Sequence, residues 1–304
     1  MKSIALVALF GLAPALPAQD PLVRGEDATQ AQKKEIARLE QWPKLAGEAA
    51  KAMKLDIERL RKSNTPEMGE QADAALTAAG AGVVPELLPI LGKERNLDAR
   101  GRIQGVLDKI TAAEHTRLLA PFFADKSREI RTWTLHRCAL FPDGELKAPA
   151  EAALAAAQAA KVKDPKTEGA DDEIYAAALC ATAAGSHQAL DLMAKNALEE
   201  WGERGVELRT ALEAVRDEEA TTFAVKLAQD ADRSRKVAGL NLLAGCGTKA
   251  AIGVVRPLLD NTDNSIRVAA INAMRGIVDG DPPIAKLPVF EAIELAKKWK
   301  ERAY

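Results

Sequence analysis

Histidine and cysteine are the residue types of this chain most able to bind a metal or act as a catalytic pair, and each occurs three times: His115, His136 and His187, and Cys138, Cys180 and Cys246. They are widely spaced, and no HExxH or CxxC sequence joins any of them. A metal site is therefore not predicted. A Cys–His nucleophile would require Cys138 to meet His136, but residues two apart on a helix point in different directions. We expect no catalytic residue and no metal.

Other chemical motifs are also missing from the sequence. It contains no GxGxxG, GxxxxGK[ST] or GxSxG pattern, and its 44 acidic residues single out no carboxylate pair. The net charge of −2 and the lack of a basic tail argue against a nucleic-acid partner. We therefore expect a protein that is not an enzyme and binds no cofactor. The three cysteines are predicted to be buried, with one disulfide among them left open.

The elements that carry these residues are predicted to be helices. Aromatic residues make up only 4% of the chain, alanine is abundant, and apolar–polar alternation of the strand type is rare. From about Ala72 the chain repeats a unit in which an apolar helix, a polar turn with Asp and an Arg precede a second apolar helix. The clearest copies are residues 118–140, 226–247 and 255–278, with a degenerate copy at 87–107.

The positions that open the second helices set the period. They are separated by 31, 44, 34, 26 and 32 residues, and are Arg100, Arg131, Tyr175, Arg209, Arg235 and Arg267. Periods of this size are typical of stacked helix pairs, none of which buries its apolar face alone. The long interval contains an Ala-rich helix near 148–160 and a polar loop at 161–172, so it holds either an inserted helix or a decayed repeat.

The best repeat resembles a HEAT repeat of the short type also found in phycobilisome-lyase-like proteins. The residues that carry the resemblance lie in 258–277 and include Leu258, Leu259, Asp260, Arg267, Ala269, Ala270, Ala273, Met274 and Ile277. The resemblance covers about 70–280. It implies an all-α fold, an α-solenoid in which antiparallel helix pairs stack in a right-handed superhelix and second helices line the concave face. Armadillo arrays are a competing solenoid, whereas the spaced Trp, Gly, Tyr and Pro of TPR repeats are absent.

The repeated Asp and Arg residues at the turns are interpreted as structural. The pairs are Asp125 with Arg131, Asp230 with Arg235, and Asp260 or Asp263 with Arg267. An Asp at a helix start caps it, and the HEAT resemblance implies ladders of such residues between neighbouring repeats.

Three residues are the candidates for binding a partner on the concave face. If Ile266, Ala270, Met274 and Ile277 face the core, Asn272 and Arg275 lie on the exposed side of their helix. His136 occupies the place of Asn272 when Arg131 is aligned with Arg267. The predicted binding residues are therefore His136, Asn272 and Arg275.

The N-terminus resembles a secretory signal peptide. Residues 1–19 have one Lys, an apolar run from Ile4 to Leu12, and then small residues and prolines, with cleavage after Ala15 or Ala18. The apolar run is shorter than the roughly 20 residues that cross a bilayer. We therefore expect export to the periplasm or the exterior, and no membrane span in the mature chain.

The rest of the chain divides into three predicted regions. Residues 20–66 form a leader and N-terminal helices, near 30–42 and 44–62; residues 67–280 form the repeat array; residues 281–304 form a capping helix. In the last helix Val289, Ile293, Ala296 and Trp299 share one apolar stripe, as a terminal cap requires.

These features favour an exported scaffold that binds a protein or peptide in the groove of a solenoid. Extended repeat surfaces do this without catalytic chemistry. Two alternatives remain open. One is an enzyme of the bilin-lyase-like type or its accessory chain, which the HEAT resemblance suggests. The other is an envelope-associated structural protein that oligomerises through its leader and the helices at 28–62.

Overall fold

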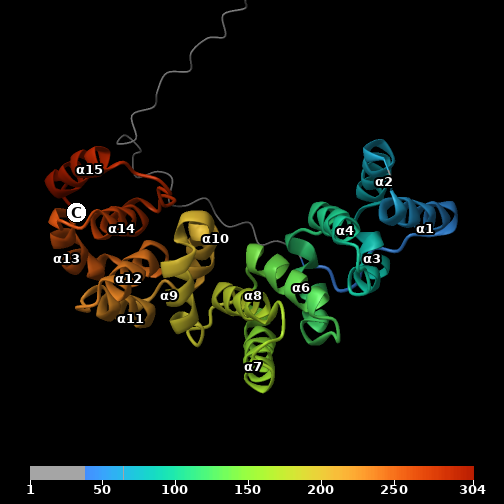
Figure 1. Ribbon diagram of the computed structural model, residues 1–304, viewed down its shortest axis with the longest axis horizontal. Helices are drawn as coiled ribbons and strands as arrows, with labels where there is room; N and C mark the ends of the chain where they lie inside the picture. The colour runs from blue at the N-terminus through green and yellow to red at the C-terminus, as the bar shows by residue number, and fades with distance from the viewer. Residues whose placement is uncertain (1–37, 64) are drawn as a thin grey trace, which may run out of the picture. The chain divides into compact units, whose positions relative to one another are not determined.

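The computed structural model describes residues 38–63 and 65–304, all within one compact unit, Ala37–Tyr304. In this part of the chain every regular element is helical and no strand is present. The expected all-α class is confirmed (Figure 1). The predicted signal peptide at 1–19 and the leader that follows it lie outside the described residues.

The first helices differ from the prediction in one place. The helix expected to end at Trp42 does not extend over 38–46, which is irregular, and Trp42 stacks on His115 instead. The second expected helix is confirmed as α1 (Gly47–Lys62). The next helix, α2 (Pro66–Ala79), starts with Thr65 as its N-cap, whose hydroxyl accepts from Met68 N at 3.3 Å.

The second helices of the repeat are regular and long. They are α4 (Leu97–Ile110), α6 (Arg128–Leu140), α8 (Ala170–Ala183), α10 (Trp201–Leu212), α12 (Arg233–Cys246) and α14 (Asn264–Met274). Each carries one of the six positions that set the period. Arg209 is an exception to the predicted role, because it lies near the end of α10 rather than at its opening.

The first helices of the repeat are more varied. They are α3 (Val84–Leu91), α5 (Thr116–Leu119), α7 (Lys147–Lys163), α9 (Leu190–Glu199), α11 (Glu218–Ala228) and α13 (Ile252–Val255). Short 3-10 turns flank the shortest two, α5 and α13. The Ala-rich helix of the long interval is α7, which pairs with α8. The interval therefore holds a complete helix pair.

Packing follows the order of the chain. Helix α6 packs on α8, α8 on α10, α10 on α12, and α12 on α14, while α7 pairs with α8 and α11 with α12. The middle second helices are consequently buried nearly all round, as in α8 and α12. Small residues permit the closest approach: a β-carbon on Gly276, just after α14, would collide with the carbonyl oxygen of Ala244 on α12.

The chain ends in α15 (Val289–Glu301), which packs on α14 as the predicted cap would. Its buried stripe is Ala292, Ala296 and Trp299, whereas Val289 is 56% exposed. The predicted stripe is therefore right at its C-terminal end and wrong at Val289. Helix α14 continues into one π-helical turn, Arg275–Asp279, and the chain then turns at Gly280, whose φ is 67°.

One stretch, Pro66–Leu91, is long and apolar enough to cross a membrane by length and composition alone. Its Leu76, Leu87 and Leu88 are fully buried in the core. A core helix of a soluble protein meets the same criterion, so this stretch carries no argument for a membrane span.

Candidate functional site

Three arginines near the start of second helices stabilise the turns that precede those helices. Arg100 donates to the carbonyl oxygen of Glu94 at 2.7 Å, and Arg131 and Arg267 donate in the same way to the carbonyls of Asp125 and Asn261 at 2.6 and 2.8 Å. In each case the acceptor lies six residues before the arginine, so the guanidinium closes the turn that precedes the second helix. The structural interpretation is confirmed for Arg131 and Arg267, and Arg100 makes the same contact.

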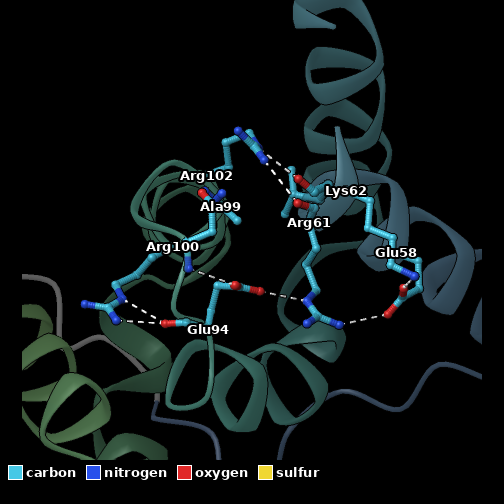
Figure 2. A network of polar contacts seen from close by, with 9 residues as sticks. Glu58, Arg61, Lys62, Glu94, Ala99, Arg100 and Arg102 are labelled. Atoms are coloured by element: carbon cyan, nitrogen blue, oxygen red, sulfur yellow. Dashed lines mark hydrogen bonds and ion pairs between the residues drawn. The ribbon is translucent and has the colours of Figure 1, made fainter. Parts of the chain in front are cut away.

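Figure 2 shows this contact at the first repeat, where a second arginine locks the same turn. Arg61 at the end of α1 pairs with the Glu94 carboxylate at 3.0 Å and with Glu58 at 2.9 Å. The main-chain N–H of Asn96 and the Arg61 guanidinium both donate to Glu94 and lower the pKa of its carboxyl, although burial opposes the shift. The turn is therefore fixed on both sides.

The acidic residues at the turns make the caps and the contacts between repeats that were expected, although not all of them pair with the arginine of their own turn. Asp230 does pair with Arg235, at 3.1 Å. Asp263 caps α14 by accepting from Ser265 N at 2.8 Å, and its ion partner is Arg233 of the preceding repeat rather than Arg267. Asp260 pairs with Lys300 of α15 at 2.6 Å. The cap at Asp263 and its contact with the preceding repeat are therefore of the two kinds predicted, while the individual partners came only from the structure.

Two further arginines join the second helices α4 and α6 to the carbonyl groups at the end of another helix. Arg102 donates to the carbonyls of Leu60 and Arg61 at 2.8 and 3.2 Å (Figure 2), and Arg137 reaches the carbonyls of Asp108 and Thr111. Cations are favoured at this negative end of a helix. These arginines are therefore committed to the protein's own main chain.

Two of the three predicted binding residues are not exposed. Asn272 is 1% exposed, and its amide pairs with both main-chain groups of Ile284, accepting from N at 2.8 Å and donating to O at 3.2 Å. Arg275 donates to the carbonyl of Pro282 at 3.3 Å and pairs with Asp281 at 3.2 Å. The prediction that these two residues lie on an exposed side is wrong, because the chain folds back over them after Gly280.

The returning segment also contacts α10. Arg209 donates to the carbonyl of Gly280 at 2.6 Å, and Pro283 packs against Gly205, where a β-carbon would lie 3.5 Å from the proline ring. We call the surface formed by Arg209, Asn272 and Arg275 under residues 280–284 the covered face. Side-chain donors there bind main-chain carbonyls of an extended segment of the protein itself.

His136, the third candidate, lies in a groove of about 1090 Å³ that we call the open groove. Its lining comes from α4, α6, the loop before α8 and Glu207 of α10, and includes Leu97, Arg100, Asp108, Arg128, Glu129, Trp133, His136, Arg137, Leu140, Glu168, Asp172 and Glu207. Leu97 is 74% exposed and Leu140 is 49% exposed. The open groove therefore presents apolar side chains to solvent between charged ones.

Side chains rather than helix packing bridge α4 and α6 along the open groove. Trp133 Nε1 donates to Asp108 at 3.0 Å, Arg137 reaches the end of α4, and Arg100 lies 4.0 Å from Glu129. These bridges leave space between the two helices, whereas α6 and α8 pack directly.

Beneath the groove a buried carboxylate joins α6 to α8. Glu173, 5% exposed, accepts from Arg131 at 2.6 and 3.0 Å and from Arg128 at 2.9 Å. Burial alone would raise the pKa of Glu173, but the two guanidinium groups hold it below its usual value. Because both arginines donate to the Glu173 carboxylate, neither guanidinium is free to bind a ligand.

At the α10 end of the groove, His136 faces two groups. Its Nδ1 lies 3.6 Å from Glu207, longer than a hydrogen bond, and its ring lies 5.6 Å from that of Tyr175. Tyr175 donates to Glu207 at 3.2 Å. Burial would raise the pKa of Glu207, but His136 and Tyr175 lower it, so the carboxylate is charged near neutral pH.

The cysteines are buried and free, as the sequence predicted for burial, and no disulfide forms. Burial raises the pKa of Cys180 and of Cys246 to about 12 and that of Cys138 well above its usual value. Since the thiolate is the nucleophile, none of these thiols is activated. In residues 38–63 and 65–304 no group of three His, Cys, Asp or Glu side chains is placed to hold a metal ion.

Comparison of the chain with protein-family models, with curated proteins and with solved structures finds no match in any of the three. The function must therefore be argued from the geometry of the molecule itself.

Sequence reasoning missed most of the open groove. Leu97 and Leu140 sit at the two ends of second helices, where the apolar pattern gives no sign that they are exposed. Glu168 and Asp172 belong to the polar loop noted at 161–172, and that loop was the one available signal, since inserted loops on one face of a repeat protein often bind partners.

Proposed function

We propose that this protein is a non-catalytic, exported scaffold of HEAT-like helix pairs, a solenoid that binds a protein or peptide partner through its second helices. The open groove carries the proposal. It combines exposed Leu97 and Leu140 with His136, whose imidazole makes no hydrogen bond within the described residues. Exposed apolar side chains rimmed by charged ones are typical of a protein-binding surface.

Several observations support binding rather than catalysis. The arginines of the groove are committed to the protein's own carbonyls or to Glu173, and the thiols are buried with raised pKa values. The groove is partly open to solvent rather than an enclosed cavity of the kind that holds small molecules. Export is supported by the N-terminal sequence pattern alone.

A site-specific cross-linking experiment tests the proposal. A photo-reactive amino acid replaces Thr132 in the groove or, as a control, the exposed Leu198 on α9, and the protein is irradiated with the native envelope and secreted fraction. We expect one partner to be cross-linked from the groove and not from Leu198. The pair of changes Leu97→Asp and Leu140→Asp should abolish that product.

Cross-linking that is equal at both positions, or unchanged by the two Asp substitutions, would contradict binding in the groove. Co-purification of a pigment instead of a protein would favour the bilin-lyase-like alternative.

A further inference from the structure

One position of the second helices recurs in contacts to polypeptide backbone. Counted from the N-cap, the ninth residue is Arg209 in α10, Asn241 in α12 and Asn272 in α14. Arg209 binds the carbonyl of Gly280, Asn241 donates to the carbonyl of Ala197 at 2.8 Å, and Asn272 binds both main-chain groups of Ile284. A polar side chain at this position thus binds backbone outside its own helix in all three.

His136 is the ninth residue of α6, counted from its N-cap Ser127. It differs from the other three because it lines the open groove and has no backbone partner in the described part of the chain. A neutral imidazole has one donor and one acceptor nitrogen, which is the same capacity that Asn272 uses on Ile284.

The lining of the groove carries more acidic than basic charge, with five carboxylates, Asp108, Glu129, Glu168, Asp172 and Glu207, and three guanidinium groups, Arg100, Arg128 and Arg137. The guanidinium groups keep their charge, but each is held by carbonyls or by Glu173. In contrast, the carboxylates of Glu168 and Asp172 take no hydrogen bond or ion pair from the described residues, and both are exposed. Glu207 adds a third negative charge beside His136. A complementary ligand therefore carries positive charge.

We propose that the open groove binds an extended segment of a partner protein, with its backbone held by His136 and a Lys or Arg side chain held by Glu168 and Asp172. This deepens the proposed function and rests on it. Leu97 and Leu140 supply contacts for apolar side chains of the segment. The covered face provides the internal precedent, because there an extended segment that contains two prolines lies on the same helix position.

Selection from a phage-displayed library of random peptides tests the proposal without assuming a sequence. The immobilised full chain is the bait, and the most enriched peptide is synthesised and titrated. We expect enriched peptides to be rich in Lys or Arg next to apolar residues. The double change Glu168→Lys and Asp172→Lys should weaken binding about tenfold, whereas Glu86→Lys, an exposed site on α3 outside the groove, should leave it unchanged.

The role of His136 has its own test. His136→Gln restores an amide like that of Asn272 and should retain most of the binding, whereas His136→Leu should lose about tenfold. N-methylation of the peptide amide that contacts position 136 should weaken binding to the unchanged protein but not weaken it further in His136→Leu.

The outcomes distinguish a failure of the proposed peptide ligand from a failure of the groove as a binding site. Enriched acidic peptides, peptides without a charge preference, or binding unaffected by Glu168→Lys and Asp172→Lys would overturn the proposed ligand while leaving the groove as the binding site. Binding that survives Leu97→Asp and Leu140→Asp would overturn both. A library that yields no enriched peptide would overturn the peptide ligand, and the cross-linking experiment then decides whether the groove binds a folded partner.

Discussion

The covered face and the open groove are built on the same position of the repeat, yet one is filled and the other is exposed to solvent. On α14 the chain turns at Gly280 and lays residues 281–284 over Asn272 and Arg275. On α6 no described segment returns over His136, and α4 is held away by side-chain bridges. The same helix position thus binds an extended segment on α10 and α14 and faces an open groove on α6.

The two regions also differ in how their charges are buried. Glu173 and Asp143, the buried carboxylates of the described residues, both lie in the half of the protein that forms the open groove. Asp143 accepts from Arg117 at 2.7 Å and pairs with Arg38 at 3.2 Å. The buried ion pairs of the described residues therefore lie near the open groove, whereas pairs near the covered face, such as Arg233 with Asp263, are more exposed.

The largest effect expected from breaking this arrangement comes from Glu173→Ala. It leaves Arg128 and Arg131 without their shared anion at the α6–α8 contact, and should lower the free energy of unfolding by about 3 kcal/mol. Asp172→Ala, on the same helix but exposed and without an ion pair in the described part of the chain, should change it by less than about 0.5 kcal/mol. Urea denaturation of both variants measures the difference, and equal effects would contradict a structural role for Glu173.

Substitution at the shared helix position sharpens the comparison. Asn272→Leu removes both hydrogen bonds to Ile284 and should cost about 2 kcal/mol, with faster hydrogen exchange of the Ile284 amide. His136→Leu should cost less than about 0.5 kcal/mol, because its ring binds no backbone in the described residues. If His136→Leu proves as destabilising as Asn272→Leu, His136 makes a structural contact of its own and the groove is not open at this position.

Removing the contact between α10 and residues 280–284 should lower the free energy of unfolding by a smaller amount. Arg209→Met removes the donor to the Gly280 carbonyl but leaves the Asn272 contacts, so we expect a loss of about 1 kcal/mol. Hydrogen exchange should increase near 280–282 and remain unchanged in α6. An equal increase in both regions would show that Arg209 acts on the whole fold rather than on the segment.

Acid should destabilise helices α6 and α8, beside the open groove, before it destabilises α12 and α14, beside the covered face. The pKa of Glu173 is held below its ordinary 4.5, and that of Asp143 below 3.8. A depressed pKa in the folded state gives stability that is fully present above the unfolded value and is lost as the pH falls through the folded value. From pH 6 to pH 3, the hydrogen-exchange protection factors, which correct for the pH dependence of the intrinsic rate, should fall in α6 and α8 before they fall in α12 and α14, and Glu173→Gln should reduce this difference.

Several features of the protein were determined by sequence alone. Alanine content and the spacing of Arg100, Arg131, Arg235 and Arg267 predicted the helical class and the second helices, because helix propensity and periodicity are local. The same locality explains why α1, α7 and α15 were placed within a few residues. The burial of the three cysteines followed from their apolar contexts.

Only the tertiary structure decided which surfaces are free. Asn272 and Arg275 are polar and correctly phased for exposure, but the turn at Gly280 brings a distant segment over them. Leu97 and Leu140 are apolar yet exposed, because side-chain bridges hold α4 away from α6. A helical pattern specifies which side chains share a face, whereas the element that covers that face depends on contacts between residues far apart in the chain.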